Sequence, residues 1–354
     1  MSKATASVTD FQLSPGLRVC GARYLLKRLI GRAEFSELWL ARDIKNTRDV
    51  ALKFLPKPFL QDTNLLEFFR EEVSREKLLK HPHIVQVYEL AHDYDSLAIA
   101  MEFVDGWSLA TLKIDKPDRR HSVSEIAPWL RELCDALTFA HDEFGILHGN
   151  LKPSNLLLSG RDGIKVSDFG FAAHIRNECS KRGIAKSGYA GIGYLSPQQV
   201  MGESPARADD IYSFGAVIFD LVTGTPPFYK GEILTQICSL KPPRMGRRLT
   251  ELGIRSEAIP PAWEEAVAAC LEKSPSDRPG TVEAVLRLLE RPEPKSRAND
   301  FTEAVESALP TTAIRRESRR LTPLITTIAA TFVVFVAVAA YWFARSGQIA
   351  PVVA

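Results

Sequence analysis

An uncharged, strongly apolar run from Thr322 to Phe343 constrains this chain more than any other feature of its sequence. An α-helix needs about 20 such residues to cross the hydrocarbon of a bilayer, and a buried core helix is usually shorter. Tyr341 and Trp342 lie at one end of the run, and the basic segment 315–320 precedes the other, as is typical of the two membrane interfaces. We therefore expect a transmembrane helix at residues 321–343 rather than a core helix.

The basic segment 315–320 also predicts the orientation of the chain. Lys and Arg residues beside a membrane helix are retained on the cytoplasmic side. We therefore expect residues 1–320 in the cytoplasm of a single-pass protein of the cell membrane, with a short tail, 344–354, outside. Residues 1–21 lack a long apolar run after the first charge, which indicates a flexible lead-in rather than a secretory signal peptide. The Pro-, Glu-, Ser-, Thr- and Arg-rich residues 291–320 are typical of a polar juxtamembrane linker.

The composition as a whole is that of an ordinary globular protein. Apolar residues make up 45% and charged residues 25% of the 354 residues, and the formal net charge is +2, so no general binding to nucleic acid is expected. The five cysteines are scattered and form no C-x-x-C pair, which argues against a disulfide framework or a zinc site.

Two kinds of periodicity divide the remaining sequence. Residues 22–104 contain short β-like runs, interrupted by a helical stretch from Leu65 to Leu79. Residues 105–290 instead show helical spacing of apolar residues, clearest at 126–141, 211–222 and 262–271. The pattern predicts a small β-rich lobe, the N-lobe, at residues 22–104 and a larger helical lobe, the C-lobe, at residues 105–290.

Charged and amide side chains interrupt these apolar runs at a few places. Lys53 stands within an apolar strand, where a cation needs an anionic partner. Glu72 on the following helix or the phosphates of a nucleotide could supply it, and the alternative is a lysine that extends to solvent. Lys152, Asn155 and Asp168 follow within about twenty residues. Their amide and carboxylate oxygens suit Mg²⁺ and the lysine offsets phosphate charge, so we hypothesise a phosphate and Mg²⁺ site.

Short motifs in a fixed order carry a family resemblance. They are V-A-L-K (50–53), H-P-H-I-V (81–85), M-E-F-V-D-G (101–106), L-K-P-S-N (151–155), D-F-G (168–170), D-I-Y-S-F-G (210–215), T-G-T-P-P-F (223–228) and D-R-P (277–279). Over residues 22–290 the chain resembles the eukaryotic-like serine/threonine protein kinases of bacteria. The resemblance implies an α+β, bilobal protein-kinase-like fold, ATP and Mg²⁺ as cofactors, and a protein partner or substrate.

The resemblance also implies roles for single residues. Lys53 would hold the α and β phosphates and pair with Glu72, while Asn155 and Asp168 would bind Mg²⁺. Lys152 would belong to the catalytic loop. The remaining ATP-binding positions are Gly31 of the glycine-rich loop, Ala51, Met101 as gatekeeper of the adenine pocket, and Glu102 and Val104 as hinge residues.

Two family motifs, the glycine-rich loop and the catalytic loop, are broken. The glycine-rich loop G-x-G-x-x-G is replaced by residues 31–36, G-R-A-E-F-S, which keep only the first glycine. The catalytic H-R-D becomes His148, Gly149 and Asn150, so a neutral amide replaces the carboxylate that accepts the substrate proton. Gly149 also removes the arginine that binds a phosphorylated activation loop, and we expect no switching of that kind. The alternative is that Asn150 is a tolerated variant.

Three further departures follow. Gly191 replaces a threonine that bridges the catalytic residues in the family, and Gln198 replaces the glutamate of A-P-E. Gln198 can still hydrogen-bond Arg278, the residue that matches the family's arginine partner. Glu76, one turn after Glu72, stands where the family packs an apolar side chain.

Three hypotheses about function remain. A general base contributes roughly 10² to 10⁴ in rate, so Asn150 alone does not exclude slow transfer. The favoured hypothesis is a membrane-anchored pseudokinase or very weak kinase that binds ATP and Mg²⁺ and signals by conformation and partner binding. The alternatives are an active serine/threonine kinase and a scaffold that binds no nucleotide.

Overall fold

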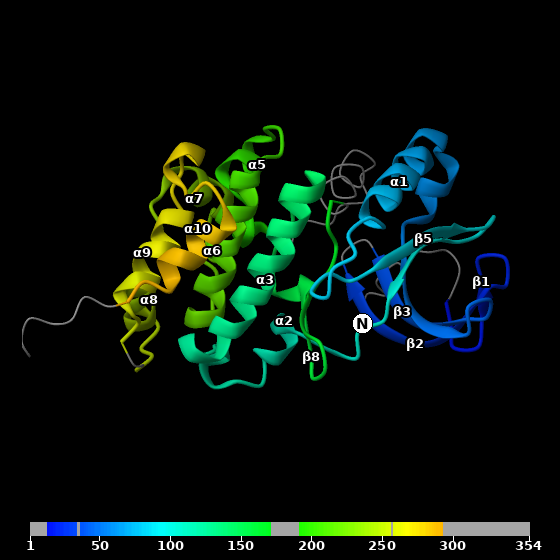
Figure 1. Ribbon diagram of the computed structural model, residues 1–354, viewed down its shortest axis with the longest axis horizontal. Helices are drawn as coiled ribbons and strands as arrows, with labels where there is room; N and C mark the ends of the chain where they lie inside the picture. Colours follow the sequence, from blue (N-terminus) through cyan, green and yellow to red (C-terminus); the bar gives the residue numbers. More distant parts are fainter. Residues whose placement is uncertain (1–12, 34–35, 171–190, 256–257, 293–354) are drawn as a thin grey trace, which may run out of the picture. The chain divides into compact units, whose positions relative to one another are not determined.

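The structure, a computed structural model, describes residues 13–33, 36–170, 191–255 and 258–292 (Figure 1). All of them belong to one compact unit, Met1–Glu293. Within these ranges no helix is both long and apolar enough to span a bilayer. The predicted membrane helix at 321–343, the tail and nearly all of the linker lie outside the described residues.

A six-stranded antiparallel sheet forms most of the N-lobe, in the order β1-β2-β3-β4-β6-β5. Its strands are β1 (Arg18–Val19), β2 (Tyr24–Ala33), β3 (Ser36–Asp43), β4 (Arg48–Phe54), β5 (Val87–His92) and β6 (Leu97–Glu102). Side chains alternate between the two faces of a strand. In β4, Val50, Leu52 and Phe54 therefore join one apolar cluster and Ala51 joins the other. Lys53 shares the face of Ala51.

The helix α1 (Thr63–Glu76) covers the face of the sheet that carries Ala51 (Figure 1). It follows the short 3-10 helix η1 (Lys57–Gln61), and Asp62 caps it by accepting a hydrogen bond from the N–H of Leu65. Leu65, Phe69 and Val73 form its buried stripe, spaced four residues apart. Glu76 continues this stripe, so the packing of the helix forces a carboxyl group into an apolar position.

The C-lobe is built around α6 (Arg207–Thr223), whose residues from Asp209 to Thr223 are all buried. Next to it lies α3 (Val123–Phe144), which Ser122 caps at the start and Gly145, at φ +62°, ends. The other helices are α2 (Leu109–Leu112), α5 (Pro197–Met201), α7 (Ile233–Ser239), α8 (Met245–Glu251), α9 (Pro261–Cys270) and α10 (Val282–Leu289), with 3-10 helices η2 (Pro117–Arg119), η3 (Pro153–Asn155), η4 (Ile192–Tyr194) and η5 (Pro275–Asp277).

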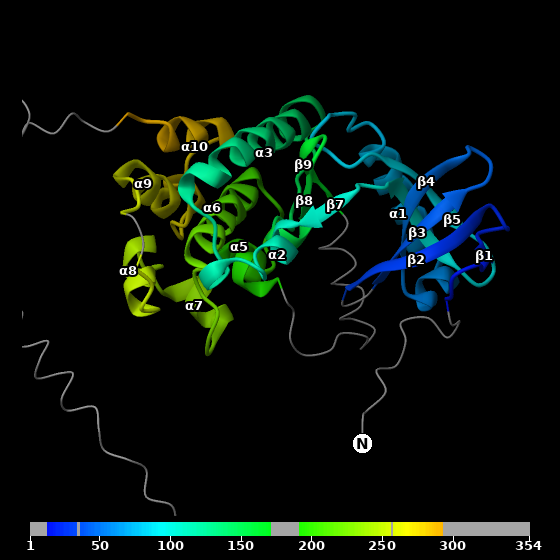
Figure 2. The ribbon, with the colours of Figure 1, turned by 90° about the horizontal axis from the view of Figure 1, so that it is seen from below.

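A second, three-stranded sheet joins the two lobes (Figure 2). It consists of β7 (Gly106–Ser108), β8 (Leu156–Ser159) and β9 (Gly163–Val166). Val85 of the N-lobe donates its N–H to the carbonyl of Val166 at 2.8 Å, and the N–H of Val166 bonds the carbonyl of His83 at 2.9 Å. This pairing holds the segments on either side of the second sheet, which carry Asn155 and Asp168, against the N-lobe.

The predicted division into a β-rich and a helical lobe is confirmed. All five β-like runs and the four helical stretches correspond to strands and helices, with ends shifted by a few residues. The small joining sheet accounts for the apolar runs on either side of the predicted phosphate and Mg²⁺ site.

Candidate functional site

Lys53 and Asp168 form the central ion pair of the site. The Nζ of Lys53, in β4, lies 2.7 Å from Oδ1 of Asp168, and both side chains are largely buried. Burial by itself would raise the pKa of Asp168, but the ammonium of Lys53, helped by Lys152 and His148, brings that pKa below its usual value. Asp168 is therefore ionised, in a left-handed backbone conformation at φ +66°.

The prediction that Lys53 pairs with Glu72 is wrong for this structure. Glu72 instead pairs with Arg75 on its own helix, with 3.0 Å between Oε1 and Nη1. A buried cation takes the nearest anion available, and across the cleft that anion is Asp168. Glu72 still faces the site, because a Cβ added to Gly170 would lie 3.1 Å from its Oε2.

Glu76 adds another carboxyl group on the same side of the cleft. Its side chain is only 5% exposed, and among the described groups its Oε1 has no hydrogen-bond partner. Burial raises the pKa of Glu76 well above its usual value, and the charges of Asp168 and Glu72 add to this rise while Lys53 opposes it. Burial therefore favours the neutral form of Glu76, at a position where the family packs an apolar side chain.

The catalytic loop is fixed by a buried aspartate of α6. Asp210 accepts hydrogen bonds from the N–H groups of His148 at 2.8 Å and Gly149 at 2.7 Å, and it lies 2.8 Å from Nε2 of His141. Gly149 adopts φ +67°, a conformation that glycine reaches without strain. The His148 ring packs on Phe169 at a centroid distance of 4.7 Å.

Asn150, Asn155 and Asp168 are brought together by this loop. The Nδ2 of Asn155 donates to the carbonyl of Asn150 at 2.9 Å, and the N–H of Ser167 donates to the carbonyl of Asn155 at 2.9 Å. Both asparagines are buried. Lys152 lies close enough to lower the pKa of Asp168. These predicted site residues therefore converge at the end of β9, next to the Lys53 pair.

The predicted adenine-binding residues lie in one apolar cluster. Ala51 and Met101 are opposite each other in the β4–β6 ladder, and Val104 packs against the same cluster. Leu38, two residues after the glycine-rich loop, and Leu157, two residues after Asn155, also pack against this cluster and were not predicted as part of the site. Their positions in strands next to the motifs were the available signal, because alternate strand residues share a face.

Glu102 is held by its neighbours at the junction of the lobes. Its N–H donates to the carbonyl of Gln86 at 2.8 Å, and its carboxylate lies 2.9 Å from Nζ of Lys165. The predicted contribution of Glu102 to a nucleotide therefore does not include its N–H, which the N-lobe already uses.

The strands of the glycine-rich loop form a hairpin whose tip, residues 34–35, lies outside the described residues. Arg32 pairs with Glu37 across the hairpin at 3.1 Å, and Glu37 also accepts a hydrogen bond from Nε1 of Trp39 at 3.0 Å. A Cβ added to Gly31 would meet no atom within 4 Å. The retained glycine thus faces open space, where the resemblance expects a nucleotide.

The substrate side keeps its hydrogen bonds despite its changed residues. As predicted, Oε1 of Gln198 accepts a hydrogen bond from Nη2 of Arg278, at 2.6 Å. Arg278 is buried and also donates to the carbonyls of Glu272, Ala208 and Lys273. A neutral amide thus occupies the place of the expected carboxylate with its geometry preserved.

Metal binding at this site would depend on few protein oxygens. Across the part of the chain that the structure describes, no group of three or more His, Cys, Asp or Glu side chains could hold a metal ion. Asp168 and Asn155 nevertheless offer a carboxylate and an amide oxygen close together. Such a pair fits Mg²⁺, which usually keeps several waters and takes further oxygens from substrate phosphates.

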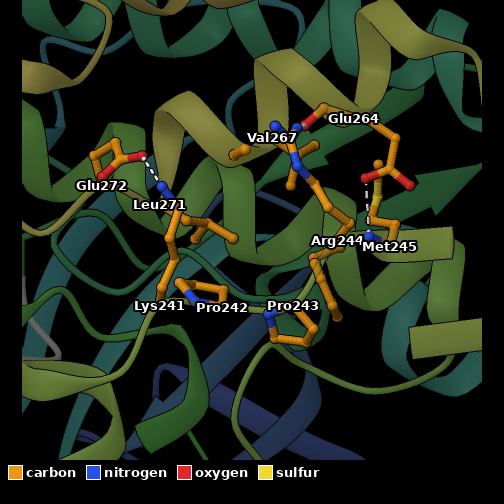
Figure 3. A pocket seen from close by; sticks show the side chains of 11 residues that line it. Lys241, Pro242, Pro243, Arg244, Met245, Glu264, Val267, Leu271 and Glu272 are labelled. Carbon is orange, nitrogen blue, oxygen red and sulfur yellow. Dashed lines mark hydrogen bonds and ion pairs between the residues drawn. The ribbon is translucent and has the colours of Figure 1, made fainter. Parts of the chain in front are cut away.

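A separate hollow in the C-lobe is structural (Figure 3). It is lined by residues 241–245 and by α9, and Figure 3 shows Glu264 pointing toward Met245. The carboxylate of Glu264 accepts hydrogen bonds from the N–H groups of Met245 at 2.9 Å and Gly246 at 2.6 Å. Since these bonds satisfy the first turn of α8, we assign this hollow no chemistry.

Comparisons with known proteins agree with this geometry. A sequence profile described as "Protein kinase domain" matches residues 24–288. The serine/threonine-protein kinase PknB of Mycobacterium leprae is 38% identical over 214 residues, which cover 58% of this chain and 33% of that protein. The serine/threonine-protein kinase PrkC of Bacillus subtilis is 33% identical over 214 residues, covering 60% and 32%. The chain thus spans about a third of the length of these curated relatives.

A solved structure shares the fold. The crystal structure of the PknI kinase domain of Mycobacterium tuberculosis matches with a TM-score of 0.60 at 24% identity, over 79% of this chain and 98% of that one. At this level of identity the likeness shows the two-lobed fold alone.

Proposed function

This chain belongs to the protein kinase family, and from that premise we propose that it binds ATP with Mg²⁺ as a pseudokinase or very weak serine/threonine kinase. It acts in signalling through nucleotide-dependent conformation and a protein partner. The observation that carries the proposal is a contrast within one site. The charged residues for phosphate and metal, Lys53 and Asp168, are present and paired, while Asn150 stands where a base is needed.

Nucleotide binding would replace the ion pair between Lys53 and Asp168 by two contacts, one from Lys53 to phosphate and one from Asp168 to Mg²⁺. When Mg²⁺ is bound it offsets the charge of the phosphates, and Asp168 and Asn155 are the residues that would hold it. Lys53 would then leave Asp168 for the α and β phosphates. Ala51, Met101, Leu38 and Leu157 would enclose the adenine ring between the lobes. The residues suit ATP and Mg²⁺ because they supply oxygen ligands for the metal ion and a cation for the phosphates.

Phosphate transfer would be slow because residue 150 carries an amide in place of the carboxylate that would accept the substrate proton. An amide can orient a hydroxyl group but cannot take its proton at neutral pH, and the missing base costs roughly 10² to 10⁴ in rate. The alternative of an active kinase is supported by one observation. Asp210 holds the loop through the N–H groups of His148 and Gly149, and these two contacts do not involve the side chain of residue 150.

Attachment to the cell membrane is part of the proposal. It rests on the sequence of residues 321–343 and on the basic segment 315–320, which together favour a kinase domain on the cytoplasmic side. Separation of membrane and soluble fractions of cells that produce the full chain tests it. Recovery of the chain in the soluble fraction would contradict the anchoring.

Phosphate transfer from labelled ATP tests the catalytic part. The full chain in detergent micelles is compared with Asp168→Asn and with Asn150→Asp, alongside a thermal shift with ATP and Mg²⁺. We expect nucleotide-dependent stabilisation, little or no transfer by the parent chain, and more transfer by Asn150→Asp. Efficient transfer that Asp168→Asn abolishes would establish the active kinase. Absence of stabilisation by ATP would favour the scaffold that binds no nucleotide.

A further inference from the structure

Gln199, at the start of α5, uses both atoms of its side-chain amide. Its Nε2 donates to the carbonyl of Gly149 at 2.9 Å, and its Oε1 accepts from the N–H of Ser196 at 3.0 Å. The N–H of Gln199 in turn donates to Oγ of Ser196, which bonds Asp209 at 2.6 Å. A carbonyl can only accept and an N–H can only donate, so this network fixes which end of the amide faces the catalytic loop.

The carbonyl that Gln199 contacts belongs to the peptide bond between Gly149 and Asn150. Asp210 holds the N–H of Gly149 on the other side, so the glycine is gripped from both ends. The carbonyl of Asn150 then accepts a hydrogen bond from Asn155. Gln199 and Asn155 therefore hold two successive carbonyls of the loop, those of Gly149 and Asn150, and Asn155 is a residue of the proposed metal site.

The neighbouring glutamine points elsewhere. Gln198 bonds Arg278 and the carbonyl of Lys273 in the interior of the C-lobe. The two adjacent side chains thus connect one short helix to two different places. Of the two glutamines, Gln199 is the one that contacts the catalytic loop, and it does so through the main-chain carbonyl of Gly149.

We propose that Gln199 is a positioning residue that couples α5 and its capping residue Ser196 to the Gly149–Asn150 peptide, and through that peptide to Asn155. This inference rests on the proposed function for its link to Mg²⁺. When the hydrogen bond from Gln199 is lost, the Gly149–Asn150 peptide turns more freely and Asn155 is held less firmly. Affinity for the Mg²⁺ complex of ATP then falls, and affinity for ATP without metal changes less.

Two glutamine-to-glutamate variants make the matched test in the full chain. Gln199→Glu keeps the oxygen that caps Ser196 but cannot donate to Gly149. Gln198→Glu makes the same chemical change one residue away, where it faces Arg278. Titration calorimetry should show that Gln199→Glu weakens binding of ATP with Mg²⁺ about threefold to tenfold, the effect of one lost hydrogen bond. Gln198→Glu should leave that affinity unchanged.

Hydrogen exchange provides a readout that does not require nucleotide. Amides of residues 148–151 should exchange faster in Gln199→Glu, about threefold to tenfold for the same lost bond, while the middle of α6 stays protected. Equal effects of the two variants, or unchanged exchange at 148–151, would overturn the proposal. If the parent chain binds no ATP, the proposed function fails, and the exchange measurement alone then decides whether Gln199 positions the loop.

Discussion

The two sides of the candidate site differ in the kind of interaction that holds them together. On the nucleotide side, charged groups remain: Lys53 pairs with Asp168, and the carboxyl group of Glu76 is buried nearby. On the substrate side, at Gly149 and Gln198, charge has been lost, but hydrogen bonds of 2.6 to 2.9 Å hold the same connections. Geometry can therefore survive without charge, since an amide or a main-chain group can replace an ion in a hydrogen bond. An amide cannot replace a carboxylate in this way where the chemistry needs a proton acceptor.

The largest effect is expected where charge is essential. Asp168→Asn keeps the shape and tolerates φ +66° but removes the anion that pairs with Lys53. Breaking a largely buried pair should lower the free energy of unfolding by about 2 kcal/mol and remove the stabilisation by ATP with Mg²⁺. Urea denaturation and thermal shift measure the two effects.

Asp49→Asn is the matched control for this variant. Asp49 pairs with Lys27 at 2.7 Å on the exposed side of the sheet. Surface pairs contribute less than about 1 kcal/mol. An equal loss of stability in the two variants would show that the Lys53–Asp168 pair contributes no more than an exposed ion pair.

Replacing the excess carboxyl group should stabilise the protein. Glu76→Leu removes a buried group whose Oε1 has no partner among the described residues, and it restores an apolar stripe on α1. We expect a gain of about 1–2 kcal/mol at neutral pH, measured by urea denaturation. Glu76→Gln, which keeps a polar group of similar size, should give a smaller gain. A loss of stability in Glu76→Leu would mean that the carboxyl group is needed.

The same residue should make stability depend on pH. The pKa of Glu76 is raised in the folded state, so the folded chain holds a proton that the unfolded chain releases above its usual value near 4.5. This contribution therefore falls as the pH rises above 4.5, until the folded-state pKa is passed. The gain from Glu76→Leu should accordingly be larger at pH 8 than at pH 5, in denaturation curves recorded at both. A gain that is constant with pH would contradict the neutral carboxyl.

A smaller effect is expected from the backbone of the catalytic loop. Gly149→Ala places a Cβ at φ +67°, where it meets no atom within 4 Å, so only backbone strain opposes it. That strain costs about 1 kcal/mol. Gly160→Ala, also in open space and without a positive φ, should be nearly neutral in the same denaturation experiment. A neutral Gly149→Ala would show that the glycine is not required by the conformation of the loop.

The smallest effect should come from restoring charge on the substrate side. Gln198→Glu gives Arg278 an anionic partner but loses the hydrogen bond from Nε2 to the carbonyl of Lys273. The two changes oppose each other, so we expect stability to shift by less than about 1 kcal/mol. Denaturation at low and high salt checks this. A gain of several kcal/mol would show that the neutral hydrogen bond between Gln198 and Arg278 is a poor substitute for an ion pair.

Much of the fold followed from local pattern. The β-like runs of residues 22–104 and the helical stretch from Leu65 to Leu79 predicted the strands of the N-lobe and α1. The motifs also located Asn150, Asn155 and Asp168, which the structure brings together. Sequence reasoning chose Glu72 as the partner of Lys53 and did not identify Leu38, Leu157 or Gln199. Each of these depends on which segments, distant in the sequence, meet in the folded chain.

The sequence by itself determined the chemical inventory: which carboxylates, amides and cations are present, and that residue 150 cannot act as a base. It also determined the two lobes, because strand and helix periodicity are properties of neighbouring residues. Only the tertiary structure decided that Lys53 pairs with Asp168, that Glu76 is buried and neutral, and that Gln199 holds the catalytic loop. Charge pairing and pKa depend on distance and burial, which are set by segments more than a hundred residues apart for Lys53 and Asp168.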